Sequence, residues 1–339
     1  MSDQTAAATA IRRPHIPAEL HRLDGIRATL AVARGVVAFA GSSVLAGFFV
    51  TRDWPLAVRI ACAVPLILLS GHGLHMMAFS GHEGIHFNFH RNKRWSALLA
   101  ILISAPVPTY MIIGYGVTHW RHHRFTNRLP DPDAHIYSPL KTFWSRVFWS
   151  RSHGTRRYFR DTVVMASGRL PVTDGRMPLP DATLIWLARV NIAVVAAWMV
   201  FYIWLTVKYP VLGVVGVWLP AAFAYYFSGL RAYVEHAGTT VGPFHDTRSY
   251  THWVYSLLFV GNNFHIEHHL YPGVPCYNLA ATHRYLRDQG ALAQAGADVV
   301  TSVGGIFRYM TSRYQYPAPT PIGVHDVDPL DDASRSTAA

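Results

Sequence analysis

Long apolar segments dominate the hydrophobic pattern of this chain. A helix needs about 20 mainly apolar residues to cross a bilayer, and four segments have about that length. They cover residues 31–50, 56–80, 184–207 and 211–234. A short polar turn around Pro55 separates the first pair, and Lys208, Tyr209 and Pro210 separate the second pair. The pattern therefore predicts an all-α, polytopic membrane protein built from two transmembrane hairpins.

A fifth apolar segment, residues 95–115, contains Pro106 and Pro108. Proline inside a helix removes a backbone hydrogen bond and bends the chain. If this segment crossed the membrane, the arginine-rich residues 121–160 would lie outside, against the tendency of basic residues to remain on the cytoplasmic side. We therefore predict about four transmembrane helices, with residues 95–115 forming a re-entrant or interfacial segment.

The remaining segments are more polar. Residues 139–160 mix aromatic side chains with arginines, as in a helix that lies in the headgroup layer; a soluble loop is the alternative. Residues 1–30 lack the features of a signal peptide and predict a cytoplasmic tail. Residues 317–339 are rich in Pro, Asp and Ala and are predicted to be disordered, which leaves residues 31–316 as one membrane domain.

Composition supports a membrane protein and limits its partners. The chain is 51% apolar and 14% charged, which is too apolar for an ordinary soluble enzyme. Its net charge of +11 would orient it in the bilayer and attract anionic lipids or an acidic protein. No basic helix or aromatic-lined groove accompanies the charge, so no nucleic acid is expected. Cys62 and Cys276 have no spacing that predicts a disulfide framework or a thiolate metal site.

Histidine is the residue type that suggests chemistry, since 20 histidines stand against 19 acidic residues. They are concentrated in three clusters, HEGIH, HWRHH and HIEHH. Residues three and four positions apart share a helix face, so each cluster can present its imidazoles to a common point. Each cluster follows an apolar segment that ends on the predicted cytoplasmic side. With one histidine at the inner end of the last span, the predicted metal ligands are His82, His86, His119, His122, His123, His236, His265, His268 and His269.

Neutral imidazoles suit iron, zinc, copper or nickel. Nine are too many for one ion, but two metals could each take four or five and keep one position open, as a catalytic site requires. Ligating histidines usually need carboxylates that orient them. The candidates for that role are Glu83, Glu235, Glu267, Asp131 and Asp133, although the two aspartates could equally shape a turn.

The other histidines have simpler expected roles. His72 and His75 lie within the second span, where polar side chains usually form hydrogen bonds between helices; metal ligation is the alternative. His90 could ligate a metal or stay at the interface among basic residues. The isolated histidines, predicted to be ordinary, are His135, His153, His245, His252, His283 and His325.

These three histidine boxes and their flanks, from about residue 59 to 286, resemble the membrane fatty acid desaturase and hydroxylase superfamily. The resemblance implies four spans, a cytosolic helical cap, and two non-haem iron ions held by the box histidines and by His236. It also implies molecular oxygen as co-substrate, with two electrons supplied from outside. The chain departs from the pattern at Ala232, where acyl desaturases carry a water-holding asparagine one helical turn before that histidine.

The expected function is that of an oxygen-dependent di-iron oxidoreductase, a desaturase that introduces a double bond into a fatty acyl or related amphiphilic chain. A hydroxylase or ketolase of a carotenoid, alkane or other small amphiphile would use the same site. A metal transporter is the distant alternative, but it should carry ionisable residues at mid-span. No haem-binding HPGG motif is present, so a separate ferredoxin, rubredoxin or cytochrome is the expected electron donor. The resemblance to bacterial members predicts a bacterial inner membrane, with both termini and the active site cytoplasmic.

Overall fold

Four long helices form the framework of the computed structural model, which describes residues 13–171, 174–311 and 313–322. They are α1 (Gly25–Val50), α2 (Leu56–Ile85), α7 (Asp181–Lys208) and a continuous run over Pro210–His236. That run consists of α8 (Pro210–Gly213), the π-helical η2 (Val214–Trp218) and α9 (Leu219–His236). Within the described residues, these four are long and apolar enough to cross a membrane. The prediction of an all-α protein with four spans is confirmed.

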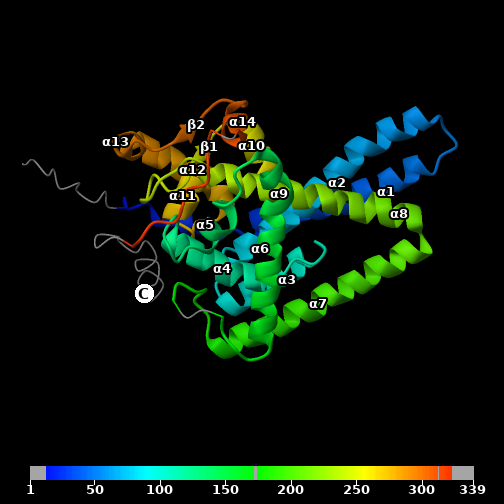
Figure 1. Cartoon of the computed structure of the whole chain (residues 1–339), viewed down its shortest axis with the longest axis horizontal. Helices are drawn as coiled ribbons and strands as arrows, with labels where there is room; N and C mark the ends of the chain where they lie inside the picture. Colours follow the sequence, from blue (N-terminus) through cyan, green and yellow to red (C-terminus); the bar gives the residue numbers. More distant parts are fainter. Residues whose placement is uncertain (1–12, 172–173, 312, 323–339) are drawn as a thin grey trace, which may run out of the picture.

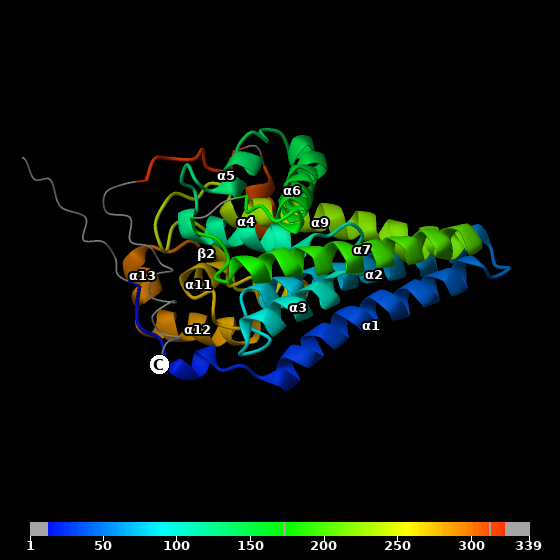
Figure 2. The ribbon, with the colours of Figure 1, turned by 90° about the horizontal axis from the view of Figure 1, so that it is seen from below.

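The long helices extend from one end of the molecule, and the shorter elements gather at that end (Figures 1 and 2). α1 and α2 form an antiparallel hairpin, in which a Cβ on Gly73 would lie 2.3 Å from the backbone nitrogen of Phe39. Only glycine allows so close a contact, since real Cβ atoms do not approach to that distance. α2 also packs against α9, so the two hairpins share one bundle.

α2 extends further than the hydrophobic pattern predicts. The apolar segment ends near Ser80, whereas the helix continues to Ile85 with His86 at its C-cap. Its last turns are buried by protein, and a helix surrounded by protein need not keep an apolar face toward lipid. The first histidine cluster therefore lies at the end of a long helix and not in a separate segment after it.

Residues 95–115 do not form one span-length helix. The chain forms α3 (Lys93–Ser104), a turn that contains Pro106 and Pro108, and then α4 (Ile112–Phe125). At 1.5 Å per residue, the 12 residues of α3 extend about 18 Å, which is too short to cross the roughly 30 Å hydrocarbon core. One face of α3 packs against α2 and α7, while Trp95, Leu99 and Leu102 on the other face are exposed, as in a re-entrant or interfacial segment.

Residues 143–166 form a 24-residue helix, α6 (Phe143–Ala166), so the alternative of a loop is wrong. Figure 1 shows α6 running across the bundle. It contacts α4 so closely that a Cβ on Gly114 would lie 2.0 Å from the carbonyl oxygen of Tyr158. Because α4 carries the second histidine cluster, this contact fixes the position of that cluster.

We call the whole end of the molecule where the histidines lie the cap. Short elements complete this end. They are η1 (Ala18–His21), α5 (Pro132–Tyr137), α10 (Trp253–Leu258), α11 (His265–Leu270), α12 (Cys276–Asp288), α13 (Ala291–Ala295) and α14 (Gly305–Met310), with a parallel pair of two-residue strands, β1 (Ser249–Tyr250) and β2 (Val299–Val300).

The segments that flank the predicted membrane domain pack on the cap where they are described. On the N-terminal side, the amide of Asp24 donates to the Tyr277 hydroxyl at 2.7 Å, and Ile16 is buried. On the C-terminal side, Leu129 and Thr320 are joined by a 2.7 Å backbone hydrogen bond. The prediction of disorder is therefore wrong for residues 317–322. Residues 1–12 and 323–339 lie outside the described part of the chain.

Candidate metal centre

The nine candidate ligands come from four helices that meet in the cap. α2 supplies the first cluster, α4 the second and α11 the third, while His236 is the last residue of α9. All nine are buried. The helices converge because α2 packs against both α4 and α9, and the short α11 packs against α12 and β1.

Eight of these histidines fall into two groups whose ligand atoms lie within 4.8 Å of one another. The larger group contains His82, His86, His119, His123 and His268. The smaller group contains His122, His236 and His269. The ninth, His265, belongs to neither group, but its ring centroid lies 4.7 Å from that of His269 and 5.3 Å from that of His236. This arrangement offers two neighbouring metal positions.

Many of the ring nitrogens lack a hydrogen-bond partner among the described residues. They include both nitrogens of His86 and of His268, and Nε2 of His269. Leaving a buried polar atom unpaired costs about 1–3 kcal/mol. Several unpaired ring nitrogens in one place therefore indicate a site that binds a ligand. Metal coordination would satisfy them.

The electrostatics favour neutral imidazoles, the form that binds metal. Burial lowers the pKa of His86 to about 3. Burial, and next the neighbouring histidines, hold the pKa values of His119, His123 and His268 well below the usual value. Nε2 of His119 lies 2.8 Å from Nε2 of His82 and 2.9 Å from Nε2 of His123. The histidines of the larger group therefore fit a transition-metal centre in number, protonation and convergence.

His122 differs from the other candidate ligands because, among the described residues, it is the one with a hydrogen bond to a carboxylate. Its Nδ1 donates to Oδ1 of Asp131 at 2.9 Å, and Oδ2 of Asp133 lies 4.0 Å away. Burial acts to lower the pKa of His122, but these two carboxylates outweigh it and raise this pKa to about 9. Asp131 also caps α5 by accepting from the Asp133 amide, so it both contacts a candidate ligand and shapes the turn.

Two of the three candidate glutamates lie beside clustered histidines. Oε1 of Glu83 is 3.4 Å from Nδ1 of His82, and Oε2 of Glu235 is 3.5 Å from Nε2 of His265. Glu83 also accepts from the amide of Cys276 at 2.8 Å. It thereby connects the first cluster to the start of α12.

Glu267 has other partners than those expected. Its carboxylate accepts from Nδ1 of His283 and from the hydroxyl of Ser249, each at 2.6 Å. The same hydroxyl accepts from the amide of Ile266 at 3.0 Å. Within the described residues Glu267 thus ties α11 to α12 and β1, and His283 has a structural partner that its isolated position in the sequence did not indicate.

Sequence reasoning missed two residues close to the histidine groups. The backbone oxygen of Asp246 accepts from Nδ1 of His236 at 2.8 Å, and burial raises the pKa of the Asp246 carboxyl to about 7. Asn262 lines the cavity beside His236 and His265, and its Oδ1 has no partner within the described residues. Both lie in connecting segments, where no helical spacing could have indicated them.

The histidines outside the two groups are also placed. Nδ1 of His75 lies 3.0 Å from the hydroxyl of Ser228 on α9, an interhelical hydrogen bond of the expected kind. His72 stacks on His75, with ring centroids 5.9 Å apart. His90 is exposed, and its Nδ1 accepts from the amide of Asn92 at 2.9 Å. None of these three belongs to a metal-binding group among the described residues.

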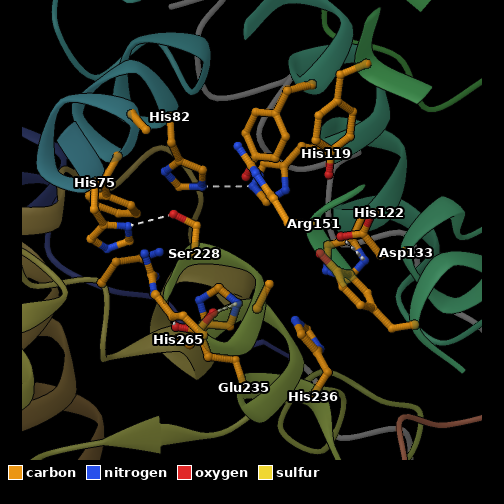
Figure 3. Close-up of a pocket in the computed structure, with 18 of the residues that line it drawn as sticks. His75, His82, His119, His122, Asp133, Arg151, Ser228, Glu235, His236 and His265 are labelled. Atoms are coloured by element: carbon orange, nitrogen blue, oxygen red, sulfur yellow. Dashed lines mark hydrogen bonds and ion pairs between the residues drawn. The ribbon is translucent and has the colours of Figure 1, made fainter. Parts of the chain in front are cut away.

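A cavity of about 90 Å³ lies beside the histidine groups, between α2, α4, α6 and α9. Figure 3 shows His82 and His119 facing each other at this cavity, with His122 and His236 at another part of its wall. A second cavity of about 320 Å³ adjoins it. The two cavities share the lining residues His75, Ala78, Tyr110, Arg151 and Ser228.

Four span-length helices with two groups of buried histidines at one end define a membrane protein with a candidate two-metal centre. A family model described as fatty acid desaturase matches residues 59–298. Because that match covers more than half of the chain, the chain belongs to the fatty acid desaturase family.

Curated relatives agree with this assignment. The chain is 24% identical to a chloroplastic omega-6 fatty acid desaturase of Brassica napus, over 80% of this chain and 62% of the relative. For the protein of the same description from Spinacia oleracea, the identity is 23%, over 61% of this chain and 49% of the relative. For that of Arabidopsis thaliana, it is 22%, over 80% and 62%. The chain thus spans between about half and two thirds of the length of these relatives.

Proposed function

We propose that this protein is an oxygen-dependent di-iron membrane oxidoreductase that introduces a double bond into a fatty acyl or related amphiphilic chain. The observation that carries the proposal is the pair of buried histidine groups beside a cavity, in a chain of the fatty acid desaturase family. All nine histidines predicted as ligands lie at this place.

Each histidine group would hold one iron. The group of five would bind the first, and the group of three, with His265 beside it, would bind the second. Bound iron would supply the oxidising chemistry, using molecular oxygen and two electrons from a separate donor. Asp131 orients the imidazole of His122, as carboxylates commonly do for ligating histidines.

The larger cavity supports an amphiphilic substrate. Leu74, Val107, Pro108, Trp218 and Ala221 form much of its lining, and apolar surface of this kind favours burial of an alkyl group. The shared lining residues connect this space with the cavity at the histidines. An alkyl group of the substrate would occupy the larger cavity.

The orientation and the electron donor are part of the same proposal. The two turns at the far end of the spans carry few basic residues, among them Arg52 and Lys208, whereas arginines are abundant in the cap. By the positive-inside tendency, the cap and both termini would face the cytoplasm of a bacterial inner membrane. A separate ferredoxin, rubredoxin or cytochrome with an acidic surface would suit the basic cap.

Metal and product analysis on one preparation tests this function. The protein would be purified in detergent, assayed for iron and zinc, and incubated with oxygen, a reductase chain and candidate acyl lipids under mass spectrometry. We expect about two iron ions per chain and a product that has lost two hydrogen atoms. A product that has gained an oxygen atom would make the protein a hydroxylase.

Two ligand variants and a matched control complete the test. His122→Ala and His268→Ala should each lower the iron content, because each removes a member of a different group. His153→Ala, an exposed histidine on α6, should not. Zinc alone in the wild-type protein, or unchanged metal content in both ligand variants, would overturn the di-iron assignment.

A further inference from the structure

The lining of the smaller cavity is unusual for a site that receives an alkyl chain. Its apolar lining side chains are Ala78, Phe79 and Ala232, and the other lining residues are histidines, tyrosines, arginines and further polar side chains. Ligand sites are usually lined mainly by apolar side chains, with a few polar groups that fix orientation. The part of the substrate that reaches this cavity should therefore carry a polar group.

Arg151 is placed to recognise that group. It is a partly buried residue of α6 and lines both cavities, and Figure 3 shows it among the side chains around the smaller one. Its guanidinium lies over the rings of Tyr110 and Tyr158, at 4.9 and 5.8 Å from their centroids. These two contacts hold the charge at the junction of the cavities.

Arg151 forms no ion pair among the described residues, although Asp133 lines the same cavity. Among the described residues, no carboxylate lies within ion-pair distance of Arg151, whereas Nε of Arg231, the other arginine of the cavity, is 2.9 Å from Oε1 of Glu235. A charge removed from water is costly unless it is paired. An acidic ligand would supply the missing partner.

A second polar atom, on His75, lies at the same junction without a hydrogen-bond partner among the described residues. His75 and Ser228 also line both cavities. Nε2 of His75 is buried and has no partner within the described residues, while its Nδ1 is engaged by Ser228. One imidazole nitrogen beside Arg151 thus has no partner where the two cavities meet.

We propose that Arg151 binds a carboxylate of the substrate at the junction of the two cavities. A guanidinium matches a carboxylate with two parallel hydrogen bonds. Since the cavity at the histidines holds only about 90 Å³, the reacting carbon lies within a few bonds of the acid. The inference rests on the proposed function and narrows its substrate to a free carboxylic acid that is oxidised near its acidic end.

Binding of radiolabelled dodecanoate to the purified, metal-containing protein tests this inference, with unlabelled methyl dodecanoate as the uncharged competitor. The wild type should bind the acid about 10- to 100-fold more tightly than the ester, as expected for a hydrogen-bonded ion pair. Arg151→Gln should remove that preference, and Arg151→Lys should restore part of it. Arg156→Gln, at an exposed arginine five residues further along α6, should bind like the wild type.

Equal affinity of the wild type for acid and ester, or an Arg151→Gln protein that binds like Arg156→Gln, would overturn the inference. The acid-to-ester ratio of the wild type needs no variant, so it remains decisive if Arg151→Gln folds poorly, which its metal content would reveal. Binding requires no turnover. Arg151-dependent binding without any oxidised product would therefore count against the proposed function, and oxidation of the ester at the same rate as the acid would count against the carboxylate anchor.

Discussion

At the scale of single residues, Asp131 shows how one side chain can serve both the candidate centre and the fold around it. Its carboxylate accepts from Nδ1 of His122 and from the amides of Asn127 and Asp133, all at 2.8–2.9 Å. It is fully buried. The turn that begins α5 thus holds the carboxylate against a histidine of the smaller group.

Replacing Asp131 with asparagine should weaken metal binding more than folding. Asparagine is about as good a helix N-cap as aspartate, so α5 should form. The neutral amide would no longer stabilise the oriented imidazole of His122, and loss of such a partner typically costs about 10- to 100-fold in metal affinity or activity. Iron retention against a chelator measures the effect. Asp288→Asn, at an exposed position on α12, is the control, and equal retention in the two variants would contradict the assigned role.

Some residues of this centre could be predicted from the sequence and others could not. The clustered histidines could be found because helical spacing fixes which side chains share a face. Asp246 and Asn262 could not, because their approach to His236 depends on the course of loops between α9 and α11. The expected contact of Glu267 with a clustered histidine failed to form, since its carboxylate points toward His283 on α12.

At the scale of elements, the crossing of α4 and α6 determines where the second histidine cluster lies. The contact depends on Gly114, whose amide donates to the hydroxyl of Thr162 at 3.0 Å. Hydropathy located the four spans, but it did not predict the extension of α2 to Ile85 or the π-helical turn over Val214–Trp218. Both features depend on packing against neighbouring helices, which hydropathy does not report.

Gly114→Ala should destabilise the protein and disturb its metal content. The new Cβ would lie 2.0 Å from the carbonyl oxygen of Tyr158, so α4 and α6 would have to separate. Forcing extra atoms into a packed core typically costs about 1–3 kcal/mol. Chemical unfolding in detergent and iron content are the two measurements. Gly41→Ala, on an open face of α1 with no atom within 4 Å of the new Cβ, is the matched control, and equal stabilities would show that the α4–α6 contact can relax.

At the scale of the whole molecule, basic residues and histidine groups lie at the same end of the bundle. The cap contains the arginines of α4, α6 and the turn between α4 and α5: Arg121, Arg124, Arg128, Arg146, Arg151, Arg156, Arg157 and Arg160. The opposite end consists of two short turns around residues 51–55 and 209, seen at the far end of the helices in Figure 2. Because basic residues favour the cytoplasmic side, this distribution supports an orientation in which the cap, and with it the histidine groups, faces the cytoplasm.

Cysteine accessibility in intact bacterial cells tests that orientation. In a Cys62→Ala background, with the buried Cys276 retained, Asp53→Cys places a thiol in the turn after α1, and Arg156→Cys places one in the cap. Because basic residues favour the cytoplasmic side, a membrane-impermeant maleimide should modify the first without permeabilisation and the second only after it. The reverse pattern would put the cap outside the cytoplasm. A cytoplasmic electron donor could not then reach the iron, so the proposed reaction would need a donor on the other side of the membrane.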